Sequence, residues 1–383
     1  MTEQNFAESF EWGVATSAHQ IEGDADGRGE SVWDRFAAEG HTADGAHARI
    51  ACDHHRLWRD DVKRMQWLGI GSYRFSVAWP RVMPEGTGPV NAAGLDFYDE
   101  LVDGLLEAGI TPCPTLYHWD LPQALQDRGG WGSRDVAEAF VDYARAVQAR
   151  LGDRVGRWIT HNEPWCIATL GHETGRHAPG LKDPALALRA AHHVLLSHGW
   201  AMQALREAAP QAELGIVLNL SPADPATDSP EDRDAARWFD GFFNRWYLDP
   251  LFRGQYPEDA VADRVARGHA EASLPFVQPG DLEAISTPMD FLGVNYYERK
   301  VMRAGPGGKP TRVVPVPKEE LTDMGWEVRP QALHDLLIRL HEEYAPPRIY
   351  ITENGAAYSD GPDANGRVAD PRRTDFLHGH LDA

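Results

Sequence analysis

The stretch IYITENG (residues 349–355) carries the strongest indication of how the chain folds. Its β-branched and aromatic beginning is typical of a buried β-strand. The strand then runs directly into Glu353, which Asn354 and Gly355 follow. A carboxylate at the end of a buried strand is costly unless a partner pairs with it or a reaction uses it. The stretch therefore raises the question of which group elsewhere in the sequence matches Glu353.

Six further strand-like segments precede this one, and a segment with helical periodicity follows each of them. The seven strand-like segments lie at residues 11–20, 72–79, 110–119, 157–164, 213–221, 290–297 and 348–355. Repeated βα units predict a parallel sheet. A doubly wound sheet would need a glycine-rich phosphate-binding turn after its first strand, and ATSAHQIEG (residues 15–23) is not one. We therefore predict one α/β domain over residues 1–383, a (β/α)8 TIM barrel with the eighth βα unit missing from the chain.

Composition limits the partners and the location of the protein. The chain has 37 basic and 58 acidic residues and a net charge of −21, which disfavours nucleic acid and anionic membranes as partners. The N-terminal stretch MTEQNFAESFEWGV lacks the basic and apolar regions of a signal peptide, and the sequence has no apolar run long enough to span a bilayer. Three cysteines, Cys52, Cys113 and Cys166, have no metal-binding spacing and indicate free thiols in a reducing compartment. These features predict a cytoplasmic location.

Polar or aromatic side chains stand at the ends of six predicted strands. They are Gln20, Arg74, His118 with Trp119, Asn162 with Glu163, Asn295 with Tyr297, and Glu353. The carboxyl ends of barrel strands converge on one mouth, where active sites lie. One histidine or glutamate alone at such a place is more simply a core residue or part of a salt bridge. Six strands that deliver such groups together predict an active site.

The pair Glu163 and Glu353 predicts glycoside hydrolysis, which needs one protonated and one ionised carboxyl group. Arg74 and Tyr297 are placed to donate to one carboxylate and keep it ionised, which suits a nucleophile. Glu163 lies in THNEPW (residues 160–165), whose apolar flank raises the pKa of a carboxyl group and suits a general acid. We expect a spacing of about 5–5.5 Å between the two carboxyl groups, the geometry of retaining enzymes.

Other residues of the predicted mouth suit a sugar. Ring hydroxyls pair with amide and imidazole groups, here Gln20, His118 and Asn162, and sugar C–H faces stack on aromatic rings, here Trp119 and Trp326. Two carboxylates and water complete the reaction, so we expect no metal and no organic cofactor. The histidines of HETGRH (residues 172–177) are five apart rather than four, which disfavours a zinc site on a helix.

Taken in order, the motifs of the chain resemble those of glycoside hydrolase family 1, the β-glucosidase family. They are FEWGVATSAHQIEG, YRFSVAWPR, TLYHWDLP, NEPW, GVNYY and ITENG, and the resemblance runs from about Phe10 to the C-terminus. It implies that Glu163 is the acid/base and Glu353 the nucleophile. It implies that Arg74 and Tyr297 support the nucleophile. It also implies substrate-binding roles, on the aglycone side for Trp326 and on the donor-sugar side for Gln20, His118, Trp119, Asn162, Asn295 and Tyr297.

The resemblance has one departure. In the family, an eighth strand follows the helix that begins near DPRRTDFL and carries residues that bind the far hydroxyls of the donor sugar, whereas this chain ends at HGHLDA. The expectation is therefore a C-terminally truncated member, a retaining β-glycosidase acting on β-glucosides with low or lost activity. Two alternatives stay open: a 6-phospho-β-glucosidase, and an inactive homologue that serves as a binding or assembly partner. The open barrel edge also predicts association with a second copy or with a related full-length chain.

Overall fold

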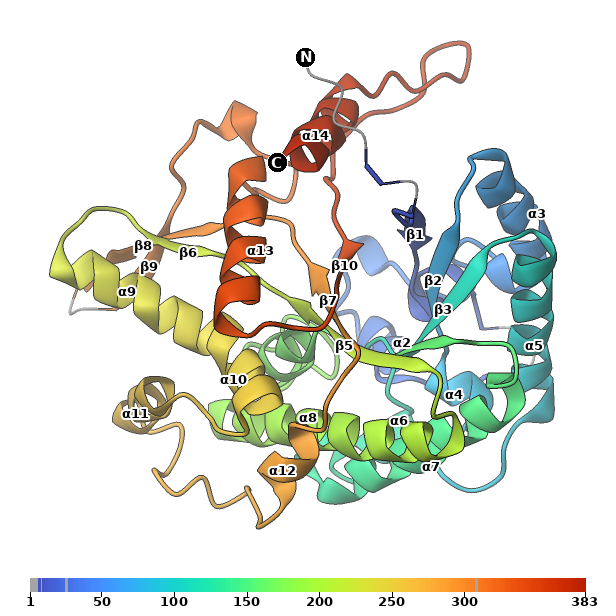
Figure 1. The fold of residues 1–383 in the computed structure, drawn as a ribbon, viewed down its shortest axis with the longest axis horizontal. Helices are drawn as coiled ribbons and strands as arrows, with labels where there is room; N and C mark the ends of the chain where they lie inside the picture. Colours follow the sequence, from blue (N-terminus) through green and yellow to red (C-terminus); the bar gives the residue numbers. More distant parts are fainter. Residues whose placement is uncertain (1–5, 8, 25–26, 307–308) are drawn as a thin grey trace.

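In the part of the chain that the structure describes, the main sheet has seven strands, all parallel, in the order β1-β2-β3-β4-β5-β7-β10 (Figure 1). The computed structural model describes residues 6–7, 9–24, 27–306 and 309–383, so residues 1–5 and 8 of the N-terminal stretch discussed above lie outside the described part. The strands are β1 (Gly13–Ala15), β2 (Ser72–Ser76), β3 (Thr111–Tyr117), β4 (Arg157–Asn162), β5 (Glu213–Asn219), β7 (Phe291–Asn295) and β10 (Ile349–Glu353). The seven predicted βα units are confirmed.

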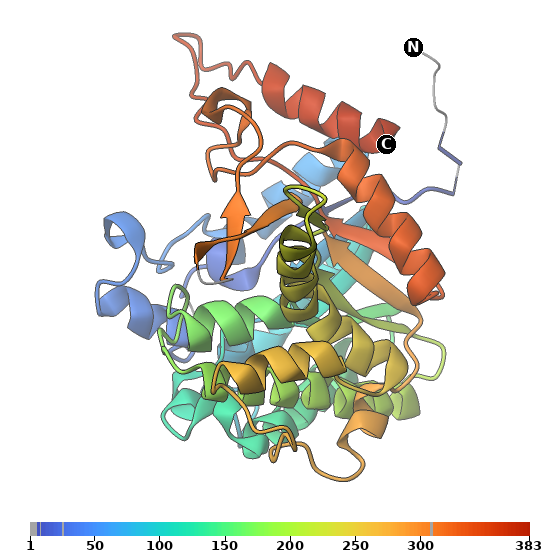
Figure 2. The same cartoon turned by 90° about the vertical axis from the view of Figure 1, so that its left-hand side faces the viewer.

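Helices connect these strands and cover the sheet. The α-helices are α1 (Ala18–Ile21), α2 (Val32–Ala38), α3 (His54–Trp67), α4 (Trp79–Val82), α5 (Ala92–Glu107), α6 (Gln123–Gln126), α7 (Arg134–Leu151), α8 (Pro184–Ala208), α9 (Pro230–Asp240), α10 (Trp246–Arg253), α11 (Glu258–Ala266), α12 (Asp281–Ile285), α13 (Pro330–Glu343) and α14 (Pro371–Asp382). The described residues also form two π-helices, η3 (Cys166–Glu173) and η4 (Gly241–Arg245), and three short 3₁₀ turns, η1 (Ala43–Gly45), η2 (Gly130–Gly132) and η6 (Lys318–Glu320). In both views α7 and α8 lie on the opposite side of the molecule from α14 (Figure 1, Figure 2). Of the described helices, none combines the length and the hydropathy that crossing a lipid bilayer requires.

Local sequence explains the two long helices that flank β4. Ser133 precedes α7 and its side chain accepts a hydrogen bond from the backbone N–H of Asp135, which caps the helix. Asp183 caps α8 in the same way, and Pro184 occupies the first turn, where its missing N–H costs nothing. Both helices pack on a sheet whose central strands are buried on both faces, as in other parallel sheets. The end of β4, which carries the mouth residues, is therefore supported by the packing of α8 on β4.

The strand at residues 349–353 is not fully buried, which corrects the sequence prediction. Its residues are half-buried or exposed, and Ile351 is 42% exposed. Among the described residues, β10 pairs with β7 alone and β1 pairs with β2 alone. Each of these two strands therefore has one edge without a paired strand in the described part of the chain.

A second, three-stranded sheet lies outside the barrel order and was not predicted. It consists of β6 (Ala223–Pro225), β8 (Lys300–Ala304) and β9 (Pro310–Val313). β6 follows β5, and β8 with β9 follows β7, so the sheet joins the segments that leave two neighbouring barrel strands. Their sequences, ADP, KVMRA and PTRV, contain no continuous apolar run of the kind that marks a buried strand.

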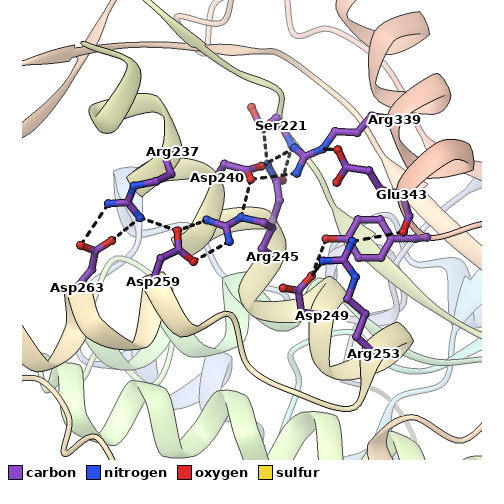
Figure 3. Close-up of polar contacts among 12 residues, drawn as sticks. Ser221, Arg237, Asp240, Arg245, Asp249, Arg253, Asp259, Asp263, Arg339 and Glu343 are labelled. Atoms are coloured by element: carbon purple, nitrogen blue, oxygen red, sulfur yellow. Dashed lines mark hydrogen bonds and ion pairs between the residues drawn. The ribbon is translucent and has the colours of Figure 1, made fainter. Parts of the chain in front are cut away.

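A network of arginines and aspartates joins the helices that follow β5 (Figure 3). Asp259 of α11 accepts hydrogen bonds from Arg237 of α9 at 2.6 Å and from Arg245 of η4 at 2.7 Å. Asp240 of α9 accepts from Arg245 at 2.9 Å and from Arg339 of α13 at 2.6 Å. These charge-assisted bonds hold four helical segments together on the outside of the barrel.

Candidate active site

Glu353 is the last residue of β10, and both oxygens of its carboxylate accept hydrogen bonds. Oε1 accepts from Arg74 Nη1 at 2.8 Å, and Oε2 accepts from the hydroxyl of Tyr297. Burial by itself raises the pKa of Glu353, but the charge of Arg74 and these hydrogen bonds outweigh it and hold the pKa below its ordinary value. Glu353 is therefore ionised near neutral pH. The two donors are those that the sequence predicts for one carboxylate.

Arg74 does not stand at a strand end, which corrects the sequence prediction. It is the third of the five residues of β2 and is 6% exposed. Its guanidinium spans the barrel instead: Nε donates to Thr115 Oγ1 at 3.0 Å, Nη2 donates to Asn162 Oδ1 at 2.6 Å, and Nη1 bonds Glu353. A buried positive charge needs such partners. The length of the side chain, rather than the position in the strand, brings the charge to the site.

Glu163 follows β4 directly and is 5% exposed. Its backbone φ is +52°, in the left-handed region that is costly for residues other than glycine and that recurs at active sites. Oε1 accepts a hydrogen bond from Asn295 Nδ2 at 2.6 Å. Burial and the nearby charge of Glu353 raise the pKa of Glu163 to about 7. Glu163 therefore retains its proton at a pH where Glu353 has lost its own.

One hydrogen-bond network connects the two glutamates. Asn295 Nδ2 donates both to Glu163 and, at 3.0 Å, to Asn162 Oδ1. Asn162 Oδ1 also accepts from Arg74, which in turn bonds Glu353. The structure thus brings residues from β2, β4, β7 and β10 together at one site. The spacing of the two carboxyl groups stays a prediction.

The end of β3 adds uncharged hydrogen-bonding groups. Because Asn162 Oδ1 accepts two hydrogen bonds, Asn162 Nδ2 is the donor to His118 Nε2 at 3.1 Å, and the imidazole proton lies on Nδ1. Burial lowers the pKa of His118 to about 3, so the ring is neutral. Trp119, with φ +78°, donates from Nε1 to Asn162 O at 2.9 Å. These groups suit a ligand that is uncharged and rich in hydroxyls.

The remaining predicted residues differ in how they join the site. Trp326 packs on Tyr297 with ring centroids 5.1 Å apart, so it borders the Glu353 side of the network. Gln20 lies on α1 rather than at a strand end, and its Oε1 accepts from Ser17 Oγ at 2.8 Å. In the described part of the chain, Gln20 shares no hydrogen bond or ring contact with the other predicted site residues.

Three residues of the site escaped the sequence analysis. Thr352 Oγ1 donates to Asn295 Oδ1 at 2.7 Å, and the Cys166 thiol donates to Glu163 with Sγ 3.0 Å from Oε2. Asn219, the last residue of β5, donates to Cys166 Sγ at 3.6 Å. The strand-end rule could have found Asn219, and the spacing of three residues between Glu163 and Cys166 could have found the thiol. The described residues contain no group of three or more His, Cys, Asp or Glu side chains arranged to hold a metal ion.

Comparison with known proteins assigns this arrangement to a family. The model of glycosyl hydrolase family 1 matches residues 2–383. The chain belongs to glycosyl hydrolase family 1. Over 388 aligned residues the chain is 46% identical to β-glucosidase A of Acetivibrio thermocellus, with 100% of this chain and 86% of that protein covered.

Solved structures of family 1 proteins superpose closely on the chain. The AHE enzyme from Alicyclobacillus herbarius gives a TM-score of 0.94 at 47% identity, with 99% of this chain and 85% of that chain covered. The family 1 β-glucosidase from Thermotoga maritima gives 0.93 at 43% identity, with 98% and 84% covered. The predicted (β/α)8 architecture and the family resemblance are confirmed, and the protein is a glycoside hydrolase. The missing eighth βα unit and the roles of single residues stay predictions.

Proposed function

We propose that the protein is a retaining β-glucosidase in which Glu353 is the nucleophile and Glu163 is the acid/base. The observation that carries this proposal is the opposite shift of the pKa in two glutamates that share one hydrogen-bond network. Carboxyl groups whose surroundings separate their pKa values divide into an acid and a base. The names of the relatives from Acetivibrio thermocellus and Thermotoga maritima, both β-glucosidases, support the substrate class.

In the first step, the Glu353 carboxylate attacks the anomeric carbon of a β-glucoside from the face opposite the leaving group. The bond from that carbon to the glycosidic oxygen breaks, and Glu163 gives its proton to this oxygen. Arg74 and Tyr297 hold Glu353 ionised and oriented until the attack. The products of the step are the free aglycone alcohol, an α-linked glucosyl ester on Glu353, and ionised Glu163.

In the second step, ionised Glu163 takes a proton from a water molecule as the water oxygen attacks the anomeric carbon. The ester bond to Glu353 breaks, and β-glucose leaves. Loss of the negative charge on Glu353 during the first step lowers the pKa of Glu163, because the repulsion between the two carboxylates has gone. Glu163 is thereby converted from an acid into a base at a constant pH.

We assign the neutral groups of the mouth to substrate binding. His118, Trp119, Asn162 and Asn295 supply hydrogen bonds and an aromatic face to the donor sugar, together with Tyr297 and Gln20. Trp326, packed on Tyr297, takes the aglycone side. No group in this set is charged near neutral pH, which favours a neutral sugar.

Two measurements, each on its own substrate, test the proposal. Proton NMR during the hydrolysis of nitrophenyl β-glucoside identifies the anomer that forms first. Retention of configuration gives β-glucose first, and α-glucose as the first product excludes this mechanism. A fluorinated glucoside with a good leaving group slows the second step and traps the ester. Peptide mapping of the trapped protein then finds the label on Glu353, and a label on any other residue refutes the assignment.

Two further proposals concern the environment of the protein. We propose that the 383-residue chain associates through the outer edges of β1 and β10, because one edge of each strand has no paired strand among the described residues. Phe10 and Trp12 beside β1 are also 43% and 44% exposed. Analytical ultracentrifugation tests this, and a monomeric mass at micromolar concentration contradicts it.

We also propose a cytoplasmic location, because Cys52, Cys113 and Cys166 are free thiols. Cell fractionation tests the location.

A further inference from the structure

The two oxygens of the Glu163 carboxyl group face donors of unequal strength. Asn295 Nδ2 lies 2.6 Å from Oε1, a short amide hydrogen bond. Cys166 Sγ lies 3.0 Å from Oε2, and a thiol is a weak donor. An oxygen that accepts a strong N–H bond is a poor place for a proton, because the two hydrogens would meet. The proton of Glu163 therefore resides on Oε2, beside the thiol.

The fold fixes the direction of the Cys166 side chain. Cys166 is the first residue of η3, and its backbone N–H bonds Glu163 O at 2.9 Å, which closes the turn between them. Asn219 at the end of β5 donates from Nδ2 to Cys166 Sγ at 3.6 Å. Because the sulfur accepts from Asn219 on one side, its hydrogen can turn to the other side, toward Glu163, once Oε2 has lost its proton. The side chain is 6% exposed, so water does not compete for these contacts.

We propose that Cys166 is a positioning residue for the acid/base carboxyl group: its thiol orients Glu163 Oε2 for proton transfer and sets how readily that oxygen gives up and regains its proton. The inference rests on the proposed acid/base role of Glu163. Before proton transfer, Oε2 carries the proton, and Cys166 Sγ either accepts a hydrogen bond from it or has its own hydrogen directed away from Oε2. As the proton passes from Oε2 to the glycosidic oxygen, the thiol hydrogen turns to the oxygen that has become negative. No proton leaves the sulfur.

The charges around Glu163 explain why a weak donor matters here. Arg74 of β2, Tyr297 after β7 and Glu353 of β10 are the titratable or charged groups that act on it besides Cys166 of η3. Burial and Glu353 raise the pKa of Glu163 to about 7, while its hydrogen bonds and Arg74 lower it. Burial and the charge of Glu163 hold the thiol pKa well above its usual value, so the thiol remains a donor. A stronger donor at Oε2 would ionise the acid at neutral pH.

Two substitutions at this position change the donor strength in opposite directions. Cys166→Ala removes the donor, and Cys166→Ser replaces it with a stronger one. The rate kcat/KM for nitrophenyl β-glucoside falls as pH rises through the pKa of Glu163, because the acid must be protonated. We expect this alkaline limb to move up by about 0.5 pH unit in Cys166→Ala and down by about 0.5 unit in Cys166→Ser. A structural role alone would not shift the limb in opposite directions.

The leaving group gives a second, independent measurement. Phenyl β-glucoside needs full proton donation, whereas a dinitrophenyl β-glucoside leaves almost without it. We expect Cys166→Ala to lower kcat/KM about tenfold for the phenyl substrate and less than twofold for the dinitrophenyl substrate. Cys113→Ala is the matched control, since Cys113 is also 6% exposed but packs in the barrel core against Ile159, Val217 and Phe291. The control leaves the alkaline limb unmoved.

The outcomes separate this inference from the proposed function. Limbs that move in the same direction in both Cys166 variants, or equal losses on both substrates, overturn the positioning role. If one Cys166 variant does not fold, as judged by circular dichroism, the direction in which the alkaline limb of the pH profile shifts in the other variant decides whether the positioning role holds. Glu163→Gln is measured in the same assays and lowers the phenyl rate far more than the dinitrophenyl rate. If Glu163→Gln shows no such difference, the acid/base assignment itself is wrong, whatever Cys166 does.

Discussion

Glu163 and Glu353 at the barrel mouth and the aspartates of the outer network experience opposite electrostatic surroundings. In the network, Asp259 and Asp240 each bond two guanidinium groups (Figure 3). The hydrogen bond from Arg245 lowers the pKa of Asp259, and the pKa of Asp240 is also lowered although burial opposes it. At the mouth, Arg74 is the guanidinium that bonds the pair within the described residues, and it bonds Glu353.

The difference shows how the ratio of charges decides between stability and chemistry. Where one carboxylate bonds two guanidinium groups, as Asp259 and Asp240 do, it ionises, and the bonds hold helices together. Where one guanidinium serves two buried carboxylates, the carboxylate that lacks it keeps a proton. The second arrangement supplies an ionised nucleophile and a protonated acid at the same pH. Residues of the same type are thus functional or structural according to their neighbours.

The largest effect is expected from removing Glu353, the carboxylate that bonds the guanidinium of Arg74. Glu353→Gly deletes the nucleophile, and we expect kcat for nitrophenyl β-glucoside to fall by roughly 10⁵-fold. Added azide fits the space, attacks from the same face and restores turnover, with an α-glucosyl azide as the product. Glu163→Gly with azide gives the β-anomer instead. An exchange of the two anomers between the variants would reverse the roles of the glutamates.

A smaller effect is expected from removing the guanidinium itself. Arg74→Met leaves Glu353 buried without its positive partner, so the pKa of Glu353 rises. We expect kcat/KM to fall by about 10³-fold and its acidic limb to move to higher pH, because the nucleophile must be ionised. Arg245→Met in the outer network is the matched control and leaves the acidic limb in place. An acidic limb that stays unchanged in Arg74→Met would disprove the role given to this arginine.

The barrel strands were predictable because a parallel strand that is covered on both faces leaves an apolar run in the sequence. β5 and β7 were found within residues 213–221 and 290–297 for this reason. The small sheet of β6, β8 and β9 was not found, because its strands are interrupted by polar residues and proline and leave no apolar run. The burial of β10 was overestimated, because its single pairing with β7 depends on tertiary structure.

In the site, the strand-end rule found residues whose backbone position decides their place, such as Glu163, Asn295 and Glu353. It misplaced Arg74, because a side chain that spans the barrel reaches the mouth from the middle of a strand. It missed Cys166, because the thiol reaches Glu163 only through the turn into a π-helix. Side-chain reach and irregular turns leave no periodic pattern in a sequence.

The repulsion between the two glutamates can be measured directly. Glu353→Gln keeps the size of the side chain and removes its charge, so the pKa of Glu163 falls below its value of about 7. We expect the pKa of Glu163 to decrease by about 1 unit. Carbon-13 NMR of protein labelled at the glutamate carboxyl carbon measures this pKa. Asp240→Asn removes a charge from the outer network and leaves the titration of Glu163 unchanged. A Glu163 titration that is the same in Glu353→Gln and in the parent protein would show that burial alone raises its pKa.

The smallest effect is expected in the outer network and concerns stability alone. In Asp240→Asn, Arg245 and Arg339 each lose one charged partner but keep Asp259 and Glu343, so the loss is partial. We expect a decrease of about 1–2 kcal/mol in the free energy of unfolding. For a chain of this length, this corresponds to roughly 1–3 °C in Tm. The rate of hydrolysis stays at the level of the parent protein, since Asp240 shares no contact with the mouth among the described residues.

The pH dependence of this loss identifies its electrostatic origin. The pKa of Asp240 in the folded protein lies below its usual 3.8, so its stabilising contribution is present above that pH and is lost as pH falls through the lowered pKa. The difference in Tm between Asp240→Asn and the parent protein therefore narrows below about pH 4. Asp60→Asn is the matched control: the Asp60–Lys63 pair is 56% and 74% exposed, and its loss changes the stability by less than about 0.5 kcal/mol. A difference in Tm that persists at low pH would show that Asp240 stabilises the helices through packing rather than charge.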